Sequence, residues 1–451
     1  MNKNNNGLIN YPSLFLFISF LTLFATMQGV HAGVVLTFDK ELIVIKPKDK
    51  GVFPKPTSSL LLVEIGRDYF SYEENNKKHI YDFKHNRIIA INNDDGTYLD
   101  DSLFVDIGFR DYEFQNRLYL GRALAAASVK DNPMAIPLSE HVFSLTAKEH
   151  HSKIKEEIKN KKVTFSWNGK ELFKYDQNIE KIKSPYKNGF IRFLRYHLGG
   201  HPRILMSLQT LAGIPSSLTM TSHNAQTKIT TLRLKSHKYI PDRLPDLSKL
   251  KAGKIDGSLA TLLDENTTFS EDMLNTSVNT LLAKATSAFN EKRYLDTILT
   301  YLEYTLATGE QMPKQFFPQR ELITADVDVN NFLGSISPKS KEQAQKAVKT
   351  LVSLHKKSKD RKHVLNIFEA NIRSSLGMQK ESVQLFHTTL KKNPYITGAW
   401  KDLGELYFRN YNSRDAWRCW DTARKLNPRH KLLEQITQFE IRLKKDNPDF
   451  F

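Results

Sequence analysis

The chain has 451 residues, of which 40% are hydrophobic and 25% are charged. This length allows two domains with substantial cores, and the composition excludes a disordered chain and a bundle of membrane helices. The formal net charge is +17. Because the basic residues are spread along the chain, we expect solubility and general attraction to anionic surfaces, including peripheral contact with an anionic membrane, rather than nucleic-acid binding.

Residues 1–32 have the pattern of a signal peptide. The apolar run from Leu14 to Met27 is too short to span a bilayer comfortably, and Val30 and Ala32 place small residues where a signal peptidase cleaves. The alternative is an uncleaved N-terminal anchor. With one cysteine, Cys419, no internal disulfide can form. We therefore expect a periplasmic or secreted bacterial envelope protein after cleavage near Ala32.

Residues 33–250 are predicted to form a β-rich α+β domain. Short β-branched and aromatic runs alternate with turn-forming residues, a pattern typical of antiparallel hairpins. Asn168-Gly169 is a strong hairpin signal, since both turn positions need positive φ. Strands are expected at residues 34–36, 42–45, 60–65, 69–72, 79–83, 87–91, 97–99, 163–167, 171–175 and 228–234.

Two helical stretches interrupt these strands. The first is predicted over residues 109–128, and the second, over residues 190–211, is broken by Gly199-Gly200-His201-Pro202. The economical packing is an antiparallel sheet with helices against one face. Residues 241–253 form the predicted linker to a helical domain at residues 255–451.

The most informative pattern lies in residues 397–430. Aromatic, small and proline positions recur there at relative spacings of 0, 3, 4, 7, 16, 20, 23 and 28, namely Trp400, Leu403, Gly404, Tyr407, Ala416, Trp420, Ala423 and Pro428. The pattern resembles the tetratricopeptide repeat (TPR), a 34-residue helix–turn–helix unit. Since one repeat cannot bury its own apolar face, neighbouring repeats are expected.

Weaker copies precede this repeat. The copy 34 residues upstream has Ala370, Ser382, Phe386 and Pro394 in register, and a more distant copy has Ala285, Thr297 and Tyr301. Another helix is expected at residues 340–354, and the Pro- and Asp-rich stretch 309–337 is predicted to interrupt the array. An amphipathic capping helix is predicted beyond the last repeat, with Leu432, Leu433, Ile436, Phe439 and Leu443 on its apolar face.

The resemblance to TPR proteins implies a protein partner on the concave face formed by the first helices of each pair. In the clearest repeat that face would carry Lys401, Glu405, Phe408 and Arg409. The alternative is that these four residues are solvated or pack between repeats. The full basic clamp that some family members use for C-terminal carboxylates is not visible in the sequence.

The N-terminal strand series resembles the open half-barrels of periplasmic lipoprotein-carrier-like proteins. That resemblance rests on the strand run of residues 60–99 and implies a curved sheet around helices, with an apolar cavity. Apolar residues would then divide between core and cavity, among them Ile65, Phe70, Ile80, Phe83, Ile89 and Ile91.

No catalytic, cofactor or metal site is predicted. Glu149-His150-His151 is the best local metal candidate, but adjacent helical histidines diverge by about 100° and favour a solvated helix. His197 and His201 are expected to cap a helix or to pack in the core. Cys419 is expected to be an inert, packed thiol. Glu113 and Arg117 have the i, i+4 spacing of a simple ion pair.

The sequence thus predicts an exported, non-enzymatic binding, scaffold or assembly protein acting through a TPR array. The first alternative is a carrier of a lipid, acyl chain or lipoprotein in the N-terminal half-barrel. The second is a hydrolase with an unrecognised site.

Overall fold

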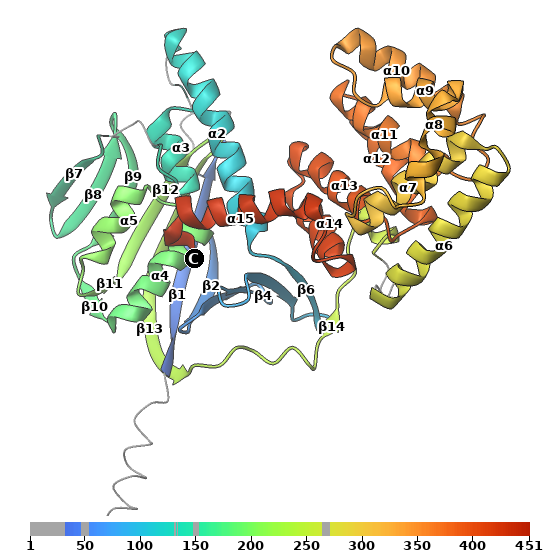
Figure 1. The fold of residues 1–451 in the computed structure, drawn as a ribbon. Coiled ribbons are helices and arrows are strands. Elements are labelled where there is room, and N and C mark those ends of the chain that lie inside the picture. Colours follow the sequence, from blue (N-terminus) through green and yellow to red (C-terminus); the bar gives the residue numbers. More distant parts are fainter. Residues whose placement is uncertain (1–31, 47–53, 130–131, 133, 148–152, 264–270) are drawn as a thin grey trace, which may run out of the picture. The chain divides into compact units, whose positions relative to one another are not determined.

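The computed structural model describes residues 32–46, 54–129, 132, 134–147, 153–263 and 271–451. Within these residues the fold is α+β, as predicted: antiparallel strands dominate the N-terminal part and helices the C-terminal part (Figure 1). Residues 1–31 of the predicted signal peptide and the Glu149-His150-His151 cluster lie outside the described residues. None of the described helices is both long and apolar enough to cross a membrane.

The chain divides into two compact units, each built from two segments. Unit 1 comprises Met1–Lys78 and Lys153–Ser248, and unit 2 comprises His79–Ser152 and Lys249–Phe451. Residues 79–152 are thus grouped with the C-terminal helices, whereas the predicted boundary lay near residue 250.

Unit 1 is organised around the long antiparallel pair of β1 (Ala32–Ile45) and β13 (Thr227–Pro241). The two strand runs predicted at residues 34–36 and 42–45 are parts of the single strand β1. The strands of unit 1 are hydrogen-bonded in the order β3-β2-β1-β13-β12-β9-β8-β7. Besides β1 and β13, these strands are β2 (Thr57–Ile65), β3 (Tyr69–Glu74), β7 (Lys155–Lys159), β8 (Lys162–Trp167), β9 (Lys170–Asp176) and β12 (Ser217–His223). Two further strands, β10 (Ile179–Lys181) and β11 (Gly213–Pro215), form a separate pair.

Local sequence signals explain two connections in unit 1. Asn168 and Gly169 join β8 to β9 with φ of 47° and 74°, which confirms the predicted hairpin. The Gly199-Gly200-His201-Pro202 segment separates α4 (Ser184–His197) from α5 (Pro202–Gln209), also as predicted.

An aromatic core joins α4 to the strands of unit 1. Phe190 stacks on Phe38 of β1 with ring centroids 5.5 Å apart, and Phe193 meets the edge of Phe70 of β3 at 5.9 Å. All four side chains are almost completely buried. The predicted packing of a helix against one face of the strands is therefore confirmed for α4 (Figure 1).

The N-terminal segment of unit 2 holds short strands and two helices. In order of hydrogen bonding its strands are β4 (Lys77–Asp82, of which residues 79–82 belong here), β5 (Arg87–Asn92) and β6 (Thr97–Ser102), and β14 (Lys251–Ala252) from the second segment of unit 2 pairs with β6. β6 is followed along the chain by α2 (Phe104–Ala126), which begins five residues before its predicted start, and by α3 (Ile136–Phe143), which was not predicted.

The rest of unit 2 is helical. Its α-helices are α6 (Glu271–Asn290), α7 (Tyr294–Thr308), α8 (Phe316–Ala325), α9 (Val327–Ser335), α10 (Lys341–Leu354), α11 (Lys362–Ser375), α12 (Gln379–Lys392), α13 (Thr397–Arg409), α14 (Ser413–Leu426) and α15 (Glu434–Asp446). The predicted helix pairs correspond to α6–α7, α11–α12 and α13–α14, the predicted cap to α15, and the helix at residues 340–354 to α10.

The stretch 309–337, which was predicted to interrupt the array, contains two short helices, α8 and α9. Pro318 stands in the first turn of α8, where a missing N–H is tolerated. Asp326 is the N-cap of α9, and its side chain accepts a hydrogen bond from Val329 N at 3.0 Å. The Pro and Asp residues that suggested a loop therefore mark the beginnings of two short helices.

The three helix pairs share buried positions in the predicted register. The first helix of each carries a small residue and the second a small residue followed four positions later by an aromatic one. These residues are Ala285, Thr297 and Tyr301, then Ala370, Ser382 and Phe386, then Gly404, Ala416 and Trp420; Gly404 is buried, and the other eight residues are at most 2% exposed. The small residues allow the paired helices to approach, and the aromatic ring packs between them.

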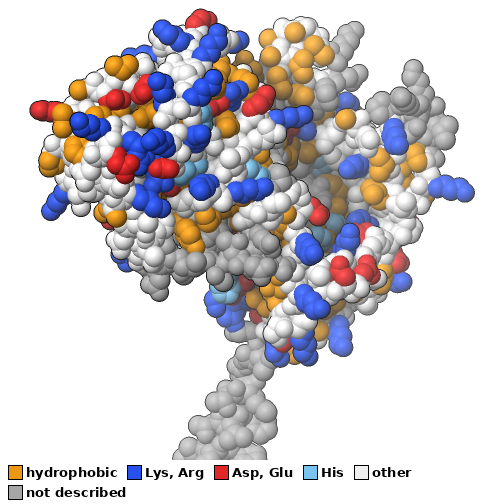
Figure 2. All heavy atoms as spheres, turned by 90° about the vertical axis from the view of Figure 1, so that its right-hand side faces the viewer, with side chains coloured by type: hydrophobic (Ala, Val, Ile, Leu, Met, Phe, Trp, Pro, Cys, Tyr) orange, Lys and Arg blue, Asp and Glu red, His pale blue; other side chains and the backbone are white. Residues whose placement is uncertain are grey.

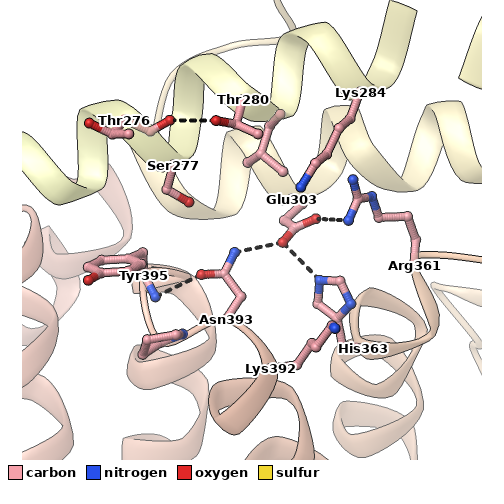
Figure 3. Close-up of a pocket in the computed structure, with 12 residues that line it drawn as sticks. Thr276, Ser277, Thr280, Lys284, Glu303, Arg361, His363, Lys392, Asn393 and Tyr395 are labelled. Atoms are coloured by element: carbon pink, nitrogen blue, oxygen red, sulfur yellow. Dashed lines mark hydrogen bonds and ion pairs between the residues drawn. The ribbon is translucent and has the colours of Figure 1, made fainter. Parts of the chain in front are cut away.

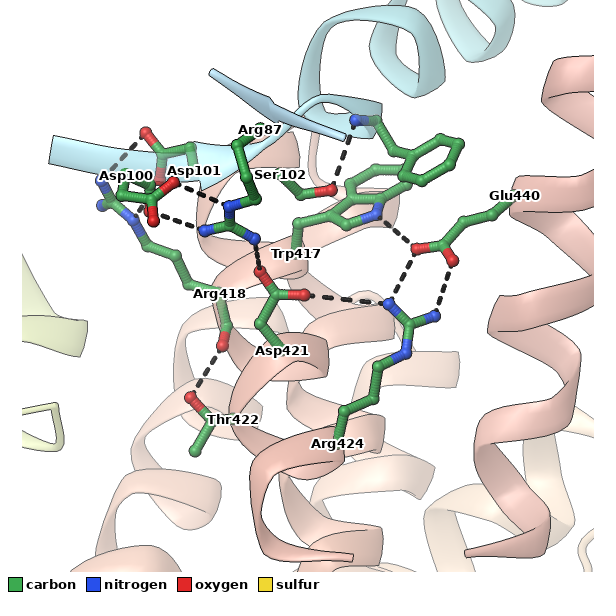
Figure 4. A network of polar contacts seen from close by, with 11 residues as sticks. Arg87, Asp100, Asp101, Ser102, Trp417, Arg418, Asp421, Thr422, Arg424 and Glu440 are labelled. Atoms are coloured by element: carbon green, nitrogen blue, oxygen red, sulfur yellow. Dashed lines mark hydrogen bonds and ion pairs between the residues drawn. The ribbon is translucent and has the colours of Figure 1, made fainter. Parts of the chain in front are cut away.

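The last helix pair is fixed to the N-terminal segment of unit 2 by a polar network (Figure 4). Arg87 of β5 bridges Asp100 and Asp421 of α14, at 2.7 Å and 2.8 Å. Arg418 of α14 pairs with buried Asp101 of β6 at 2.8 Å. Since Arg87 and Arg418 each connect α14 to one of these strands, the two contacts define how α14 sits on β5 and β6.

Candidate functional site

A cavity of the helical region lies in a groove bounded by α6, α7, the beginning of α11 and the end of α12. Its volume is about 570 Å³, and an adjoining cavity of about 390 Å³ continues past Arg361. The first is lined mainly by hydroxyl, amide and charged side chains (Figure 3). They are Thr276, Ser277, Thr280, Leu281, Lys284, Glu303, Arg361, His363, Lys392, Asn393, Pro394 and Tyr395.

A buried carboxylate forms the base of this groove. Glu303 of α7 is 1% exposed. Its Oε1 lies 2.8 Å from His363 Nε2 and accepts a hydrogen bond from Asn393 Nδ2 at 2.7 Å. Its Oε2 lies 3.6 Å from Arg361 Nη1. A buried charge is tolerated only when it is paired in this way, so the four side chains hold one another in place.

Arg361 is itself positioned by a chain of hydrogen bonds. Its Nε donates to Thr300 Oγ1 at 2.8 Å, one helical turn before Glu303. Its backbone N–H donates to Ser358 Oγ at 3.1 Å, and Ser358 donates to Asp296 Oδ1 at 2.6 Å. The loop before α11 is thereby tied to one face of α7, and this fixes the floor of the groove.

These contacts keep Glu303 ionised. Burial by itself would raise the pKa of Glu303, but the hydrogen bond and charge of His363, together with Arg361 and Asn393, outweigh it and hold the pKa below its usual value. The groove floor is therefore a neutralised ion pair and not a free negative charge.

The lowered pKa of Glu303 predicts acid sensitivity of the helical region. A carboxylate whose pKa is lower in the folded state stabilises the fold above its unfolded pKa of about 4.3, and this contribution is lost as the pH falls through the folded value. Glu303→Gln should cost about 3 kcal/mol at pH 7, because Arg361 and His363 lose their charged partner. In urea titrations from pH 7 to pH 3.5, the gap between wild type and Glu303→Gln should shrink as the pH falls.

The control is Glu381→Gln, on an exposed position of α12. It should leave the free energy of unfolding nearly unchanged across the same pH range. A gap for Glu303→Gln that stays constant from pH 7 to pH 3.5 would contradict the role assigned to this carboxylate.

Two lysines stand at the rim of the groove. Lys284 extends from α6 towards Glu303 and Arg361, and Lys392 ends α12 beside His363 (Figure 3). Both residues are exposed. Over the described part of the chain, neither has an ion-pair or hydrogen-bond partner. By contrast, Arg293 at the far end of the second cavity is paired with Asp296 and Asp360, at 2.7 Å and 2.8 Å.

The four contact residues predicted in the last repeat do not form one accessible surface. Lys401 is 7% exposed and pairs with Glu405, whose Oε1 lies 2.6 Å from its Nζ. Phe408 packs among Tyr112, Trp417, Trp420 and Phe439, with ring centroids 5.0–5.7 Å apart. Of the four, Arg409 is exposed.

The aromatic cluster explains this difference. The resemblance placed Phe408 on an open concave face, but in this chain α2 and α15 contribute Tyr112 and Phe439 to the same place. Their rings cover Phe408, so this residue is a packing contact. The available groove lies farther up the array, between α6–α7 and the beginning of α11.

Most of the residues that define the predicted repeat are buried. Trp400, Leu403, Tyr407, Ala416, Trp420 and Ala423 are all buried, and Pro428 stands exposed beyond the end of α14. A Cβ atom on Gly404 would lie 2.3 Å from Trp420 Nε1 and 3.0 Å from the carbonyl oxygen of Ala416. The absence of a side chain at residue 404 is therefore required for the close approach of α13 and α14.

The remaining candidates have structural roles. The side chain of His201 accepts a hydrogen bond from Arg203 N at 3.2 Å and caps α5, whereas His197 packs on Tyr72 and Phe193. Arg117 donates to Glu113 at 3.0 Å as expected. Cys419 is fully buried, and burial raises the pKa of its thiol. Among the described residues, no group of three His, Cys, Asp or Glu side chains could hold a metal ion.

The basic side chains are dispersed on the face of the molecule that Figure 2 shows, where they are interspersed with acidic ones.

No protein-family model matches the chain, and no curated protein matches its sequence. The candidate site therefore rests on the geometry of the groove.

Sequence reasoning missed this groove, although one signal was present. Glu303 is a lone carboxylate in the otherwise uncharged segment of residues 297–309 on α7. An isolated acidic residue on an apolar helix is expected to find a buried partner. Its partners come from residues 361, 363 and 393, which are 58 to 90 positions away and carry no recognisable spacing.

Proposed function

We propose that this protein is an exported, non-enzymatic binding or assembly protein whose helical region is a TPR-type array that recruits a protein partner. The observation that carries the proposal is the groove of about 570 Å³ beside α6 and the beginning of α11. These are first helices of their pairs, the elements that line the partner-binding face in the family that the sequence resembles. The groove has the size and preformed polar contacts of a recognition site.

The register of buried residues supports the TPR assignment. Three helix pairs repeat the same order of small, small and aromatic positions, although α8, α9 and α10 intervene between the first pair and the second. Stacked pairs of this kind bury apolar surface between neighbours and leave one face for a ligand.

Burial of the predicted cavity residues favours an interaction protein over a carrier of an apolar ligand. Ile65, Phe70 and Ile80 are at most 1% exposed, and Ile89 and Ile91 at most 9%. Phe38, Phe190 and Phe193 occupy the space between α4 and the strands. Apolar residues that a carrier would divide between core and cavity are thus engaged in close packing, whereas the helical groove is open and carries charged and hydroxyl side chains.

Export remains part of the proposal on the sequence of residues 1–32. The apolar run of residues 14–27 and the small residues before Gly33 support cleavage near Ala32 and a location in the periplasm or outside the cell. Lys and Arg residues dispersed over the visible surface also suit peripheral contact with an anionic membrane.

The test of partner recruitment is site-specific photo-cross-linking in producing cells. A photoreactive amino acid in place of Thr280, which lines the groove and is exposed, should give one discrete protein adduct. The matched control is Lys349, which is exposed on α10 and does not line the groove. No adduct at residue 280, or the same adducts at both positions, would count against the groove as the partner site.

A further inference from the structure

The rim of the groove carries uncompensated positive charge. Lys284 and Lys392 both line the cavity, and neither has an acidic partner within the described residues. The other charged groups nearby are matched: Glu303 is held by Arg361 and His363, and Arg293 is held between two aspartates. Charges without partners are therefore concentrated on the two lysines.

These lysines stand on separate elements with the floor of the groove between them. Lys284 comes from the middle of α6 and Lys392 from the end of α12, with Glu303 and His363 between (Figure 3). A single compact anion would be drawn to a point where cations converge. Two ammonium groups on opposite walls instead suit two anionic groups separated along a chain.

One wall has the length of a short extended segment. Thr276, Thr280 and Lys284 recur at i, i+4 and i+8 on α6 and so follow one face of the helix. At a rise of 1.5 Å per residue, eight residues extend about 12 Å, which matches three to four residues of an extended peptide at about 3.3 Å each. Hydroxyl groups along this wall would contact a peptide backbone, and Lys284 stands at its end.

We propose that the groove binds an extended acidic peptide segment of a partner protein, with carboxylate side chains of that segment on Lys284 and Lys392. This inference rests on the partner recruitment proposed above and specifies its chemistry. The charge is recognised on side chains within the segment, so a free C-terminus is not required. Binding through two exposed lysines should weaken as the salt concentration rises, because salt screens exposed charges and the Debye length is only about 10 Å at 0.1 M.

The test uses the full chain and a labelled peptide with an acetylated N-terminus and an amidated C-terminus. It contains two glutamates separated by two small polar residues, and its matched counterpart has glutamine in their place. Fluorescence anisotropy at low salt should show tighter binding of the glutamate peptide. The double variant Lys284→Gln/Lys392→Gln should weaken that binding by about tenfold or more.

The control variant Lys346→Gln/Lys349→Gln removes the same charge from exposed positions on α10 and should leave binding within about twofold. Equal binding of the two peptides, or equal losses in the two double variants, would overturn the inference. Displacement by inorganic phosphate without any preference for the glutamate peptide would also overturn it. If the adduct at residue 280 still forms in that case, partner recruitment stands and the acidic chemistry falls.

Discussion

Replacing Trp417 by alanine is expected to lower the free energy of unfolding of the helical region by about 3–5 kcal/mol. Trp417 is fully buried on α14, stacks on Phe104 and packs against Phe408, Trp420 and Phe439. Its indole N–H donates to Glu440 at 3.1 Å. The truncation would leave a large cavity among α2, α14 and α15, because the surrounding rings belong to different elements and cannot collapse together.

The measurement is urea denaturation followed by far-ultraviolet circular dichroism. Trp417→Phe keeps most of the apolar contact and loses the hydrogen bond, so it should cost clearly less than the alanine variant. A loss below about 1 kcal/mol for Trp417→Ala would show that the N-terminal segment of unit 2 does not depend on this cluster.

The second large effect is expected at Gly404. Gly404→Leu would place a Cβ atom 2.3 Å from the Trp420 ring and force the remaining side chain between α13 and α14. It would also disturb the hydrogen bond from Trp420 Nε1 to the carbonyl oxygen of Lys401 at 3.1 Å. Overpacking of this kind costs about 1–3 kcal/mol or more, even after the roughly 1 kcal/mol that leaving glycine restores to a helix.

Gly334 on α9 provides a matched control. It is also a helical glycine, but a Cβ atom there would meet nothing within 4 Å. Gly334→Leu should therefore be neutral or slightly stabilising in thermal melting, whereas Gly404→Leu should lower the melting temperature by several degrees. Equal melting temperatures for wild type and Gly404→Leu would show that the assigned repeat register is wrong.

The sequence predicted those parts of the fold in which local chemistry and global packing agree. Helix pairs α11–α12 and α13–α14 could be predicted because small and aromatic residues recur at fixed spacing. The β8–β9 hairpin could be predicted because Asn168-Gly169 dictates its turn. Strand β7 was missed, since its five residues, Lys155–Lys159, are exposed and four of them are charged. Its place depends on pairing with β8, which outweighs local propensity.

The candidate site was less predictable than the fold. Trp400 and Trp420 fit the spacing of the predicted repeat, but no local pattern showed that Tyr112 of α2 would cover Phe408. Likewise, Glu303 gave a hint of burial, while its partners Arg361 and Asn393 come from loops between helices. Long-range contacts of this kind depend on the tertiary path of the chain, which helical periodicity does not encode.

Unit 2 combines two chain segments that lie far apart in the sequence. This arrangement affects how the chain folds during synthesis. The contact between Arg87 and Asp421 joins residues 334 positions apart, so β5 and α2 are made long before the helix that covers them. During synthesis, Phe104 therefore stays exposed until Trp417, which stacks on it, has been made. We expect slow acquisition of the native state, because an exposed apolar helix face promotes misassembly in a long chain.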